Sequence, residues 1–152
     1  MGRDAIYRVS IVRLTNNKKQ YMANFDIAFP ITLAREGFYS NDPDDNGGET
    51  VYGIARKFNP TCSIWVVVDS FRKLPNFPLN MKNDPRIVKE VKIFYKKNYW
   101  DTLSLDSVVD QPSGTELFDT AVNAGVGFQA NGLQLAVWLL GHDIVLDGKV
   151  GQ

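Results

Sequence analysis

Residues 35–50 read REGFYSNDPDDNGGET, a stretch that holds five carboxylates between a predicted helix and a glycine-rich turn. After Ser40 it consists mainly of asparagine, aspartate, proline and glycine, a composition typical of turns. Glu36 differs from the other acids because it follows Leu33 by one helical turn, at the end of an apolar helix. The sequence therefore separates one carboxyl at a helix end from several in a polar loop.

Three kinds of site would explain these carboxylates. Asp42, Asp44 and Asn46 match the first half of an EF-hand calcium loop, but Gly53 stands where the bidentate glutamate is needed. A solvated turn is the second explanation. The third is an active site for glycoside cleavage, which needs one carboxyl that keeps its proton beside groups that stay charged. Burial at the helix end would raise the pKa of Glu36 relative to acids in a wet loop.

Length and composition restrict the class of protein. The 152 residues, 44% hydrophobic and 22% charged, suit one compact domain. Seventeen basic and seventeen acidic residues cancel, so we expect no nucleic-acid partner. The single cysteine, Cys62, and the single histidine, His142, exclude an internal disulfide framework and most zinc schemes. Apolar runs are too short for a membrane span, so we expect no stable membrane insertion.

Most of the predicted structure is helical. Asn24 is expected to cap a first helix, and Asp84 followed by proline is expected to open another that ends near Trp100. Ser113 and Glu116 match a capping box that would open a third helix. A last helix is predicted around residues 133–140. Residues 50–58 are consistent with a short strand or a helix start, and residues 65–68 with a strand or a buried helix.

The motif EGFYSNDPDDNGGETVYGIA at residues 36–55 closely resembles the signature E-G-G-Y-x-N-D-P-x-D-x-G-G-x-T-x-x-G-I. That signature belongs to the N-acetylmuramidases of glycoside hydrolase family 108. These are lysozyme-like endolysins of phages and prophages, some of them called secretion activator proteins. The resemblance continues through NYWD at 98–101, LFDTAVNAG at 117–125 and LQLAVWLLG at 133–141. It covers roughly residues 22–141.

The resemblance implies a mainly α, lysozyme-like fold with a small β-hairpin or loop lobe at the active site. By position it makes Glu36 the general acid, while Asn123 either faces the cleft or ties its helix to the catalytic loop. The cleft would be lined by Tyr39, Asp42, Asp45 and Thr50. The second catalytic group, and with it a retaining or inverting outcome, stays open. Phe38 replaces the second glycine of the signature and puts a bulky side chain beside the acid.

The predicted function is a peptidoglycan hydrolase that cleaves the β-1,4 bond between N-acetylmuramic acid and N-acetylglucosamine. Glycan strands of peptidoglycan are the expected partner, and no cofactor or metal is expected. One alternative is a catalytically impaired, glycan-binding phage remnant, as Phe38 would suggest. A further alternative is a protein with a calcium-binding loop. The sequence contains no feature that predicts the oligomeric state.

Three segments are expected: an N-terminal extension over residues 1–21, a catalytic domain over 22–141, and the start of a truncated peptidoglycan-binding segment over 142–152. The last resembles a V-D-G-x-x-G repeat through IVLDGKVGQ. Arg8 and Arg13 interrupt any signal-peptide core. We therefore expect synthesis in the cytoplasm and action in the periplasm or cell wall. The family implies export through a holin-like pore or another route.

Overall fold

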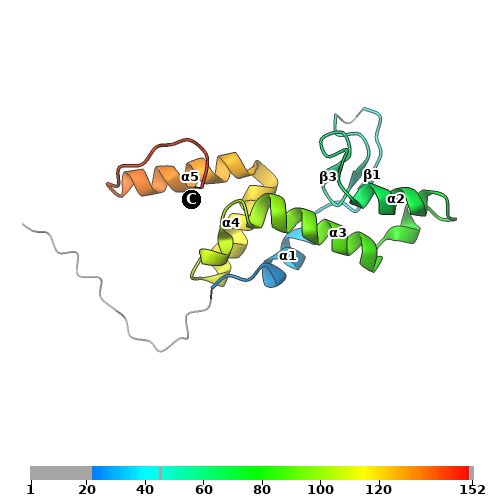
Figure 1. The fold of residues 1–152 in the computed structure, drawn as a ribbon, viewed down its shortest axis with the longest axis horizontal. Helices are drawn as coiled ribbons and strands as arrows, with labels where there is room; N and C mark the ends of the chain where they lie inside the picture. The colour runs from blue at the N-terminus through cyan, green and yellow to red at the C-terminus, as the bar shows by residue number, and fades with distance from the viewer. Residues whose placement is uncertain (1–21, 45, 151–152) are drawn as a thin grey trace, which may run out of the picture.

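The computed structural model describes residues 22–44 and 46–150, in which helices predominate (Figure 1). The predicted extension over residues 1–21 lies outside this described part, as does Asp45. The α-helices are α1 (Phe25–Leu33), α2 (Ile64–Arg72), α3 (Pro85–Tyr95), α4 (Gln111–Ala124) and α5 (Val126–Leu139). The strands are β1 (Tyr39–Ser40), β2 (Thr50–Val51) and β3 (Ile54–Ala55). Short 3-10 turns cover Leu79–Met81 and Leu105–Ser107, and a π-helical turn covers Lys96–Trp100. This composition confirms the predicted mainly α class with a small β lobe.

The strands form an antiparallel sheet in the order β1-β2-β3. Residues 50–55, consistent with a strand or a helix start from sequence alone, are the β2–β3 hairpin. Tyr52 and Gly53 form its two-residue turn, and both have positive φ, at 44° and 75°. Glycine reaches such angles without the steric cost that other residues meet, so its presence favours this tight turn. The amide of Tyr52 donates to the carbonyl of Phe38 at 2.9 Å, which holds the turn against the chain that leads into β1.

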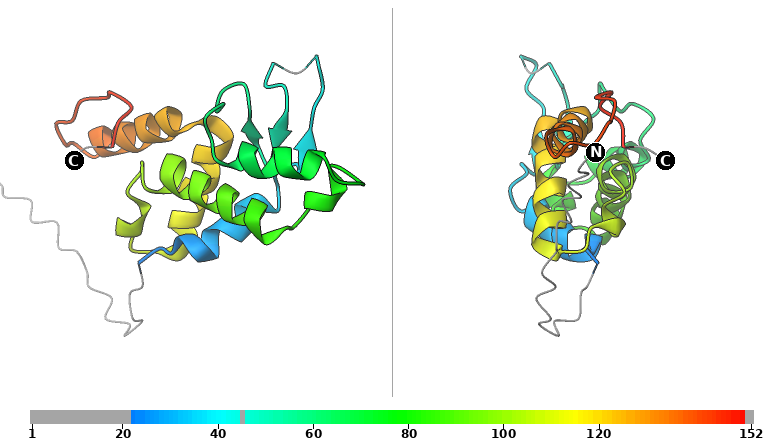
Figure 2. Two further views of the ribbon diagram at one scale, coloured as in Figure 1. Left: turned by 45° about the vertical axis from the view of Figure 1, so that its right-hand side comes forward. Right: turned by 90° about the vertical axis from the view of Figure 1, so that its left-hand side faces the viewer.

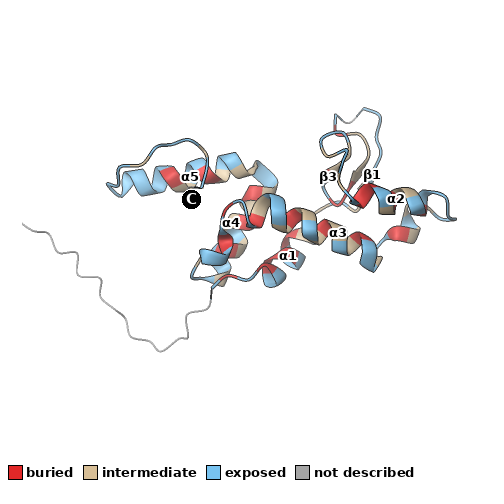
Figure 3. Ribbon diagram, viewed as in Figure 1, coloured by how far each residue is buried: buried red, intermediate tan, exposed pale blue. Residues whose placement is uncertain are grey.

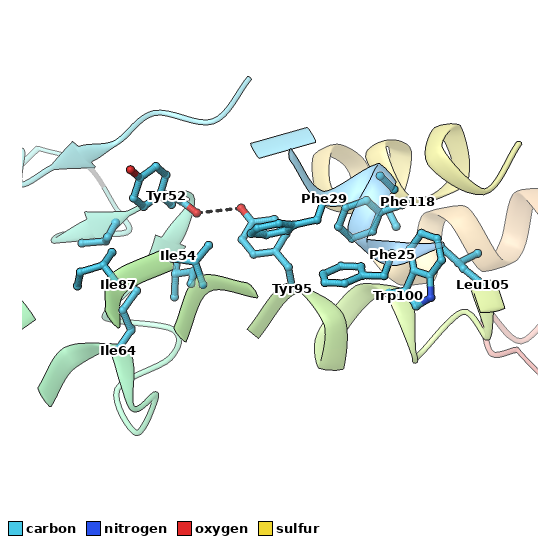
Figure 4. Close-up of a cluster of buried hydrophobic side chains, with 14 of the residues drawn as sticks. Phe25, Phe29, Tyr52, Ile54, Ile64, Ile87, Tyr95, Trp100, Leu105 and Phe118 are labelled. Atoms are coloured by element: carbon cyan, nitrogen blue, oxygen red, sulfur yellow. Dashed lines mark hydrogen bonds between the residues drawn. The ribbon is translucent and has the colours of Figure 1, made fainter. Parts of the chain in front are cut away.

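The sheet and α2 lie at one end of the molecule and α5 lies at the other, with α1, α3 and α4 between them (Figure 2). Buried residues concentrate in the middle helices and near the sheet, whereas most of α5 is exposed (Figure 3). Phe25, Trp100 and Phe118 pack edge to face with ring centroids 5.5–5.6 Å apart (Figure 4). Trp100 is fully buried, so its ring belongs to the core and is not exposed for stacking on a sugar.

The starts of α1 and α4 are joined closely. Asn24 caps α1 as predicted, accepting from the amide of Asp26 at 2.8 Å. Its own amide donates to Gln111 Oε1 at 2.7 Å. A Cβ added at Gly114 would lie 2.3 Å from Ala23 Cβ, so only glycine permits this approach of the two chains. The contact fixes how the later turns of α4 lie against the end of α1.

Two local predictions are decided by the structure. Asp84 caps α3, as expected, through the amide of Arg86 at 2.9 Å. The Ser113 capping box is wrong: α4 begins earlier, with Asp110 as its cap, and the Asp110 carboxylate accepts from the amide and hydroxyl of Ser113. The reason is Pro112, which lacks an N–H and suits the first turn of a helix, so the helix starts ahead of Ser113. Residues 65–68 belong to α2.

After α5 the chain turns back along the helix. Gln134, buried on α5, donates to Asp147 Oδ1 at 2.8 Å and to the carbonyl of Lys149 at 2.7 Å, and accepts from the amide of Gly148 at 2.9 Å. These bonds fix residues 147–149 against the helix. Whether residues 142–152 begin a peptidoglycan-binding segment stays a prediction. Across the described ranges, every helix is too short or too polar to cross a bilayer.

Candidate active site

Glu36 lies just beyond the end of α1. The helix ends at Leu33, and the amide of Glu36 donates to the Leu33 carbonyl at 3.1 Å, which closes one last turn. The side chain is half-buried and lines a surface hollow of about 450 Å³. Apolar groups of α1 form part of the wall, and Phe38, Tyr52 and Lys82 form more of it. The predicted placement of one carboxyl at an apolar helix end is therefore confirmed.

The carboxyl of Glu36 rests against the turn of the β2–β3 hairpin. A Cβ built on Gly53 would lie 2.8 Å from Glu36 Oε2 and 2.7 Å from the hydroxyl oxygen of Tyr95. That hydroxyl donates to the carbonyl of Tyr52 at 2.8 Å, the dashed line in Figure 4, and so links α3 to the same turn. The absent side chain at Gly53 therefore makes room for the acid, in addition to allowing the positive φ.

Glu36 has the electrostatic surroundings of a carboxyl that holds its proton. Burial raises its pKa above the ordinary value, and the negative charge of Asp119 raises it further. The phenols of Tyr95 and Tyr99 lie close enough for the Glu36 charge to raise their own pKa values, after the larger effect of burial. Both phenols are therefore neutral near pH 7 and do not offset the charge of Asp119.

Asp119 reaches this region from α4. Its Oδ2 lies 2.5 Å from Nη1 of Arg35, the residue before Glu36. Its Oδ1 is buried and has no hydrogen-bond partner among residues 22–44 and 46–150. The residue was not predicted as part of the site. The one sequence signal was its position four residues before Asn123, which puts both on one face of a helix.

The model of the family Glycosyl hydrolase 108 matches residues 29–125 of the chain. The match spans α1 to α4, including the acid, the sheet and Asp119. The chain belongs to glycoside hydrolase family 108. The protein is therefore a glycoside hydrolase with a glycan substrate, and its family supports a peptidoglycan hydrolase in general. Searches of curated proteins and of solved structures found no match.

Several residues that the family resemblance assigns to the cleft have other partners in the structure. The Tyr39 hydroxyl donates to Glu49 Oε1 at 3.1 Å. The Thr50 hydroxyl donates to the carbonyl of Gly48 at 3.1 Å. Asp42 is exposed, and its Oδ1 accepts from the amide of Asp44 at 2.9 Å, as in a solvated turn. Their roles in glycan binding stay predictions, as does that of Asp45, outside the described residues.

Asn123 is exposed on α4, and its Nδ2 donates to the carbonyl of Asp119 within the same helix, at 2.8 Å. This hydrogen bond runs along α4, whereas the ion pair of Asp119 with Arg35 connects the helix to the segment that carries the acid. Asp119, one helical turn before Asn123, thus links α4 to the segment that carries Glu36. A place for Asn123 in the cleft stays a prediction.

Phe38, the departure from the family signature, packs on the hairpin and also borders the space beside Glu36. Its ring packs edge to face on Tyr52, with centroids 5.3 Å apart, and Lys82 Nζ lies 5.9 Å from the ring centroid. The same side chain borders the hollow beside Glu36. It therefore supports the hairpin turn and narrows the space next to the acid. Over the described ranges, no group of three or more His, Cys, Asp or Glu is arranged to hold a metal ion.

Proposed function

We propose that the protein is an N-acetylmuramidase that cleaves the β-1,4 bond between N-acetylmuramic acid and N-acetylglucosamine, with Glu36 as general acid. The observation that carries the proposal is the half-buried Glu36 carboxyl, which borders an open hollow and has a raised pKa. A general acid must hold its proton near the working pH and still reach the leaving oxygen. Glu36 combines burial against the hairpin with access to the hollow.

In the proposed reaction, Glu36 donates its proton to the glycosidic oxygen while the bond to the anomeric carbon breaks. The sugar passes through an oxocarbenium-like transition state. The Glu36 carboxylate that forms on proton transfer stabilises its positive charge. A water molecule then supplies hydroxide to the anomeric carbon, and its other proton restores Glu36. The exposed Asp42 and Asn123, together with Tyr39, Asp45 and Thr50, are the proposed glycan contacts.

The proposed setting follows from the substrate. Peptidoglycan lies outside the cytoplasm, so we expect the protein to act in the periplasm or cell wall after synthesis in the cytoplasm. An endolysin of a phage or prophage, or a secretion activator protein of that origin, is the proposed biological role. These proposals rest on the resemblance of the motif around Glu36 to the muramidase signature.

The test is a digest of purified peptidoglycan followed by identification of the reducing-end sugar by mass spectrometry. We expect N-acetylmuramic acid at the new reducing ends. Glu36→Gln keeps the shape and removes the proton donor, so it should lower the initial rate about 10²–10⁴-fold. Glu116→Gln is the matched control, because Glu116 is an exposed carboxylate on α4, and it should hydrolyse at the wild-type rate.

Two results would contradict the proposal. A Glu36→Gln variant with wild-type rates would remove Glu36 from the chemistry. Reducing-end N-acetylglucosamine would assign the other glycosidic bond. The impaired, glycan-binding alternative is favoured by Phe38, which narrows the hollow. It predicts that the wild-type protein sediments with peptidoglycan and releases no reducing ends, and that Phe38→Gly restores hydrolysis.

A further inference from the structure

An ion pair connects α4 to the residue that precedes the proposed acid. Arg35 Nη1 and Asp119 Oδ2 are 2.5 Å apart, although 84 positions separate them in the sequence. The two partners differ in their surroundings, because the Arg35 side chain is 63% exposed and the Asp119 side chain 13%. Since Glu36 follows Arg35 directly, the pair anchors the short segment that carries the acid.

The two oxygens of the Asp119 carboxylate have unequal environments. Oδ2 accepts from Arg35, whereas Oδ1 is buried and makes no hydrogen bond within the described part of the chain. Most buried carboxylate oxygens are paired, because leaving one unpaired costs about 1–3 kcal/mol or more. A largely solvated guanidinium also screens its partner less than a buried one would. Asp119 therefore presents incompletely neutralised negative charge to the interior.

The position of Asp119 depends on helix packing as well as on Arg35. The close approach of Gly114 to Ala23 and the bond from Asn24 to Gln111 hold the start of α4 against the start of α1. Asp119 lies in the middle of α4, next to the fully buried Phe118. An amide at position 119 should therefore keep the same place, so charge can be removed without moving the helix.

We propose that Asp119, held by Arg35, is a positioning residue that keeps the segment carrying Glu36 in place and acts on the Glu36 carboxyl through its negative charge. This inference rests on the proposed role of Glu36. Like charges in a poorly solvated region disfavour double ionisation, so the negative charge of Asp119 disfavours the ionised form of Glu36. In agreement, the charge of Asp119 is the second cause, after burial, of the raised pKa of Glu36.

Other titratable and charged groups surround Glu36. Tyr95 and Tyr99 face it from α3 and the following π-helical turn and are neutral near pH 7. Lys82 lines the same hollow, and Arg35 is the cation that pairs with Asp119. Among these charged groups, it is Asp119 whose charge raises the pKa of Glu36.

The experiment compares pH–rate profiles of peptidoglycan clearing for the wild type, Asp119→Asn and Arg35→Met. Activity falls as pH rises through the pKa of a general acid, so the alkaline limb reports Glu36. Without the Asp119 charge, this limb should move to lower pH, and without the Arg35 charge, which leaves Asp119 without its cation, it should move to higher pH. A merely structural role would lower the rates of both variants without shifts in opposite directions.

Glu116→Gln is the control for loss of a carboxylate, and its alkaline limb should coincide with that of the wild type. Thermal melting by circular dichroism establishes that each variant is folded. If Asp119→Asn is unfolded, the inference is tested by the shift of the alkaline limb in Arg35→Met alone. If the folded variants had the same alkaline limb of the pH–rate profile as the wild type, and Glu36→Gln were inactive, this inference would be wrong and the proposed function would remain. Activity of Glu36→Gln would instead overturn the proposed function.

Discussion

The two ends of the β2–β3 hairpin hold carboxyl groups with different partners. At the turn, Glu36 rests on Gly53, and burial together with Asp119 raises its pKa. At the open end, Glu49 accepts hydrogen bonds from two arginines, Arg56 and Arg72. Arg56 also donates to Asp69 on α2 at 2.6 and 2.8 Å, and these bonds lower the pKa of Asp69. One short hairpin thus separates a carboxyl suited to proton transfer from a cluster of ionised groups suited to holding the lobe together.

The comparison shows that the partners of a carboxylate indicate its role better than the number of carboxylates near a motif does. Glu49 is only 11% exposed, yet it lies between cations and also accepts from Tyr39. Glu36 is the carboxyl whose burial is reinforced by a second negative charge. Burial without a cation favours the neutral acid, whereas burial between guanidinium groups favours the carboxylate. The turn end is therefore where we expect chemistry, and the open end is where we expect stability.

Among changes to the hairpin itself, the largest effect should come from Gly53→Ala, which fills the space beside the Glu36 carboxyl. The new Cβ would lie 2.8 Å from Glu36 Oε2 and 2.7 Å from Tyr95 Oη, so the carboxyl must move. Displacement of a catalytic group by about 1 Å can lower a rate about 10²-fold, and we expect a loss of that order in peptidoglycan clearing. Thermal melting would measure the accompanying strain at the positive φ.

Gly141→Ala is the matched control for that strain. Gly141 also has positive φ, at 90°, but its added Cβ would meet nothing within 4 Å. We expect it to lower the melting temperature without lowering the specific activity of the folded protein. Equal losses of activity in the two variants would mean that backbone strain, rather than the contact with Glu36, explains the effect at Gly53.

Much of this contrast depends on contacts that sequence periodicity does not report. The apolar period of α1 and the cap at Asn24 placed Glu36 at a helix end, because both signals are local. The pairing of Arg35 with Asp119 spans 84 positions, and it follows from the packing of Gly114 on Ala23. No local pattern encodes that packing. The signal that could have found Asp119 was the helical face it shares with Asn123.

The contacts at the open end of the hairpin are not visible in the sequence for a related reason. Tyr39 and Thr50 were assigned to the cleft by resemblance, while the structure shows hydroxyls that donate to Glu49 and to the carbonyl of Gly48. The valine-rich run at 66–68 is equally compatible with a strand or a helix, so α2 and its Asp69 could not be placed beside Arg56 in advance. Trp65, whose ring lies 5.0 Å from the guanidinium carbon of Arg56, completes that contact.

An intermediate effect is expected from Arg56→Met at the open end. The variant removes the bonds to Glu49 and Asp69 and leaves the largely buried Glu49 side chain with Arg72 and Tyr39. We expect a loss of about 1–2 kcal/mol in the free energy of unfolding, measured by urea denaturation, because a partly buried carboxylate loses one of its cations. Below the melting temperature, the rate of peptidoglycan clearing should stay within about threefold of the wild-type rate. Arg56 lies away from Glu36, so its replacement should change the activation barrier of the reaction only slightly.

The result at Arg56 sharpens the division between the two ends. If Arg56→Met kept its stability and lost its activity, the open end of the hairpin would contribute to the reaction and not to stability. Lys57→Met is a suitable control, because it removes an exposed positive charge next to Arg56 in the sequence. We expect its unfolding curve to overlay that of the wild type.

The smallest effect concerns Asp69 and depends on pH. Its pKa is lowered first by the hydrogen bonds from Arg56, so the folded state favours the carboxylate. A lowered pKa contributes stability that is fully present above the unfolded value of about 3.9 and is lost as pH falls through the folded value. Asp69→Asn should therefore melt below wild type at pH 7 and approach it under more acidic conditions. Because the Asp69 side chain is 45% exposed, the difference at pH 7 should stay under about 1 kcal/mol. Melting curves from pH 2 to 7 would measure it, and a gap that is constant over that range would mean that the amide acts through shape instead of charge.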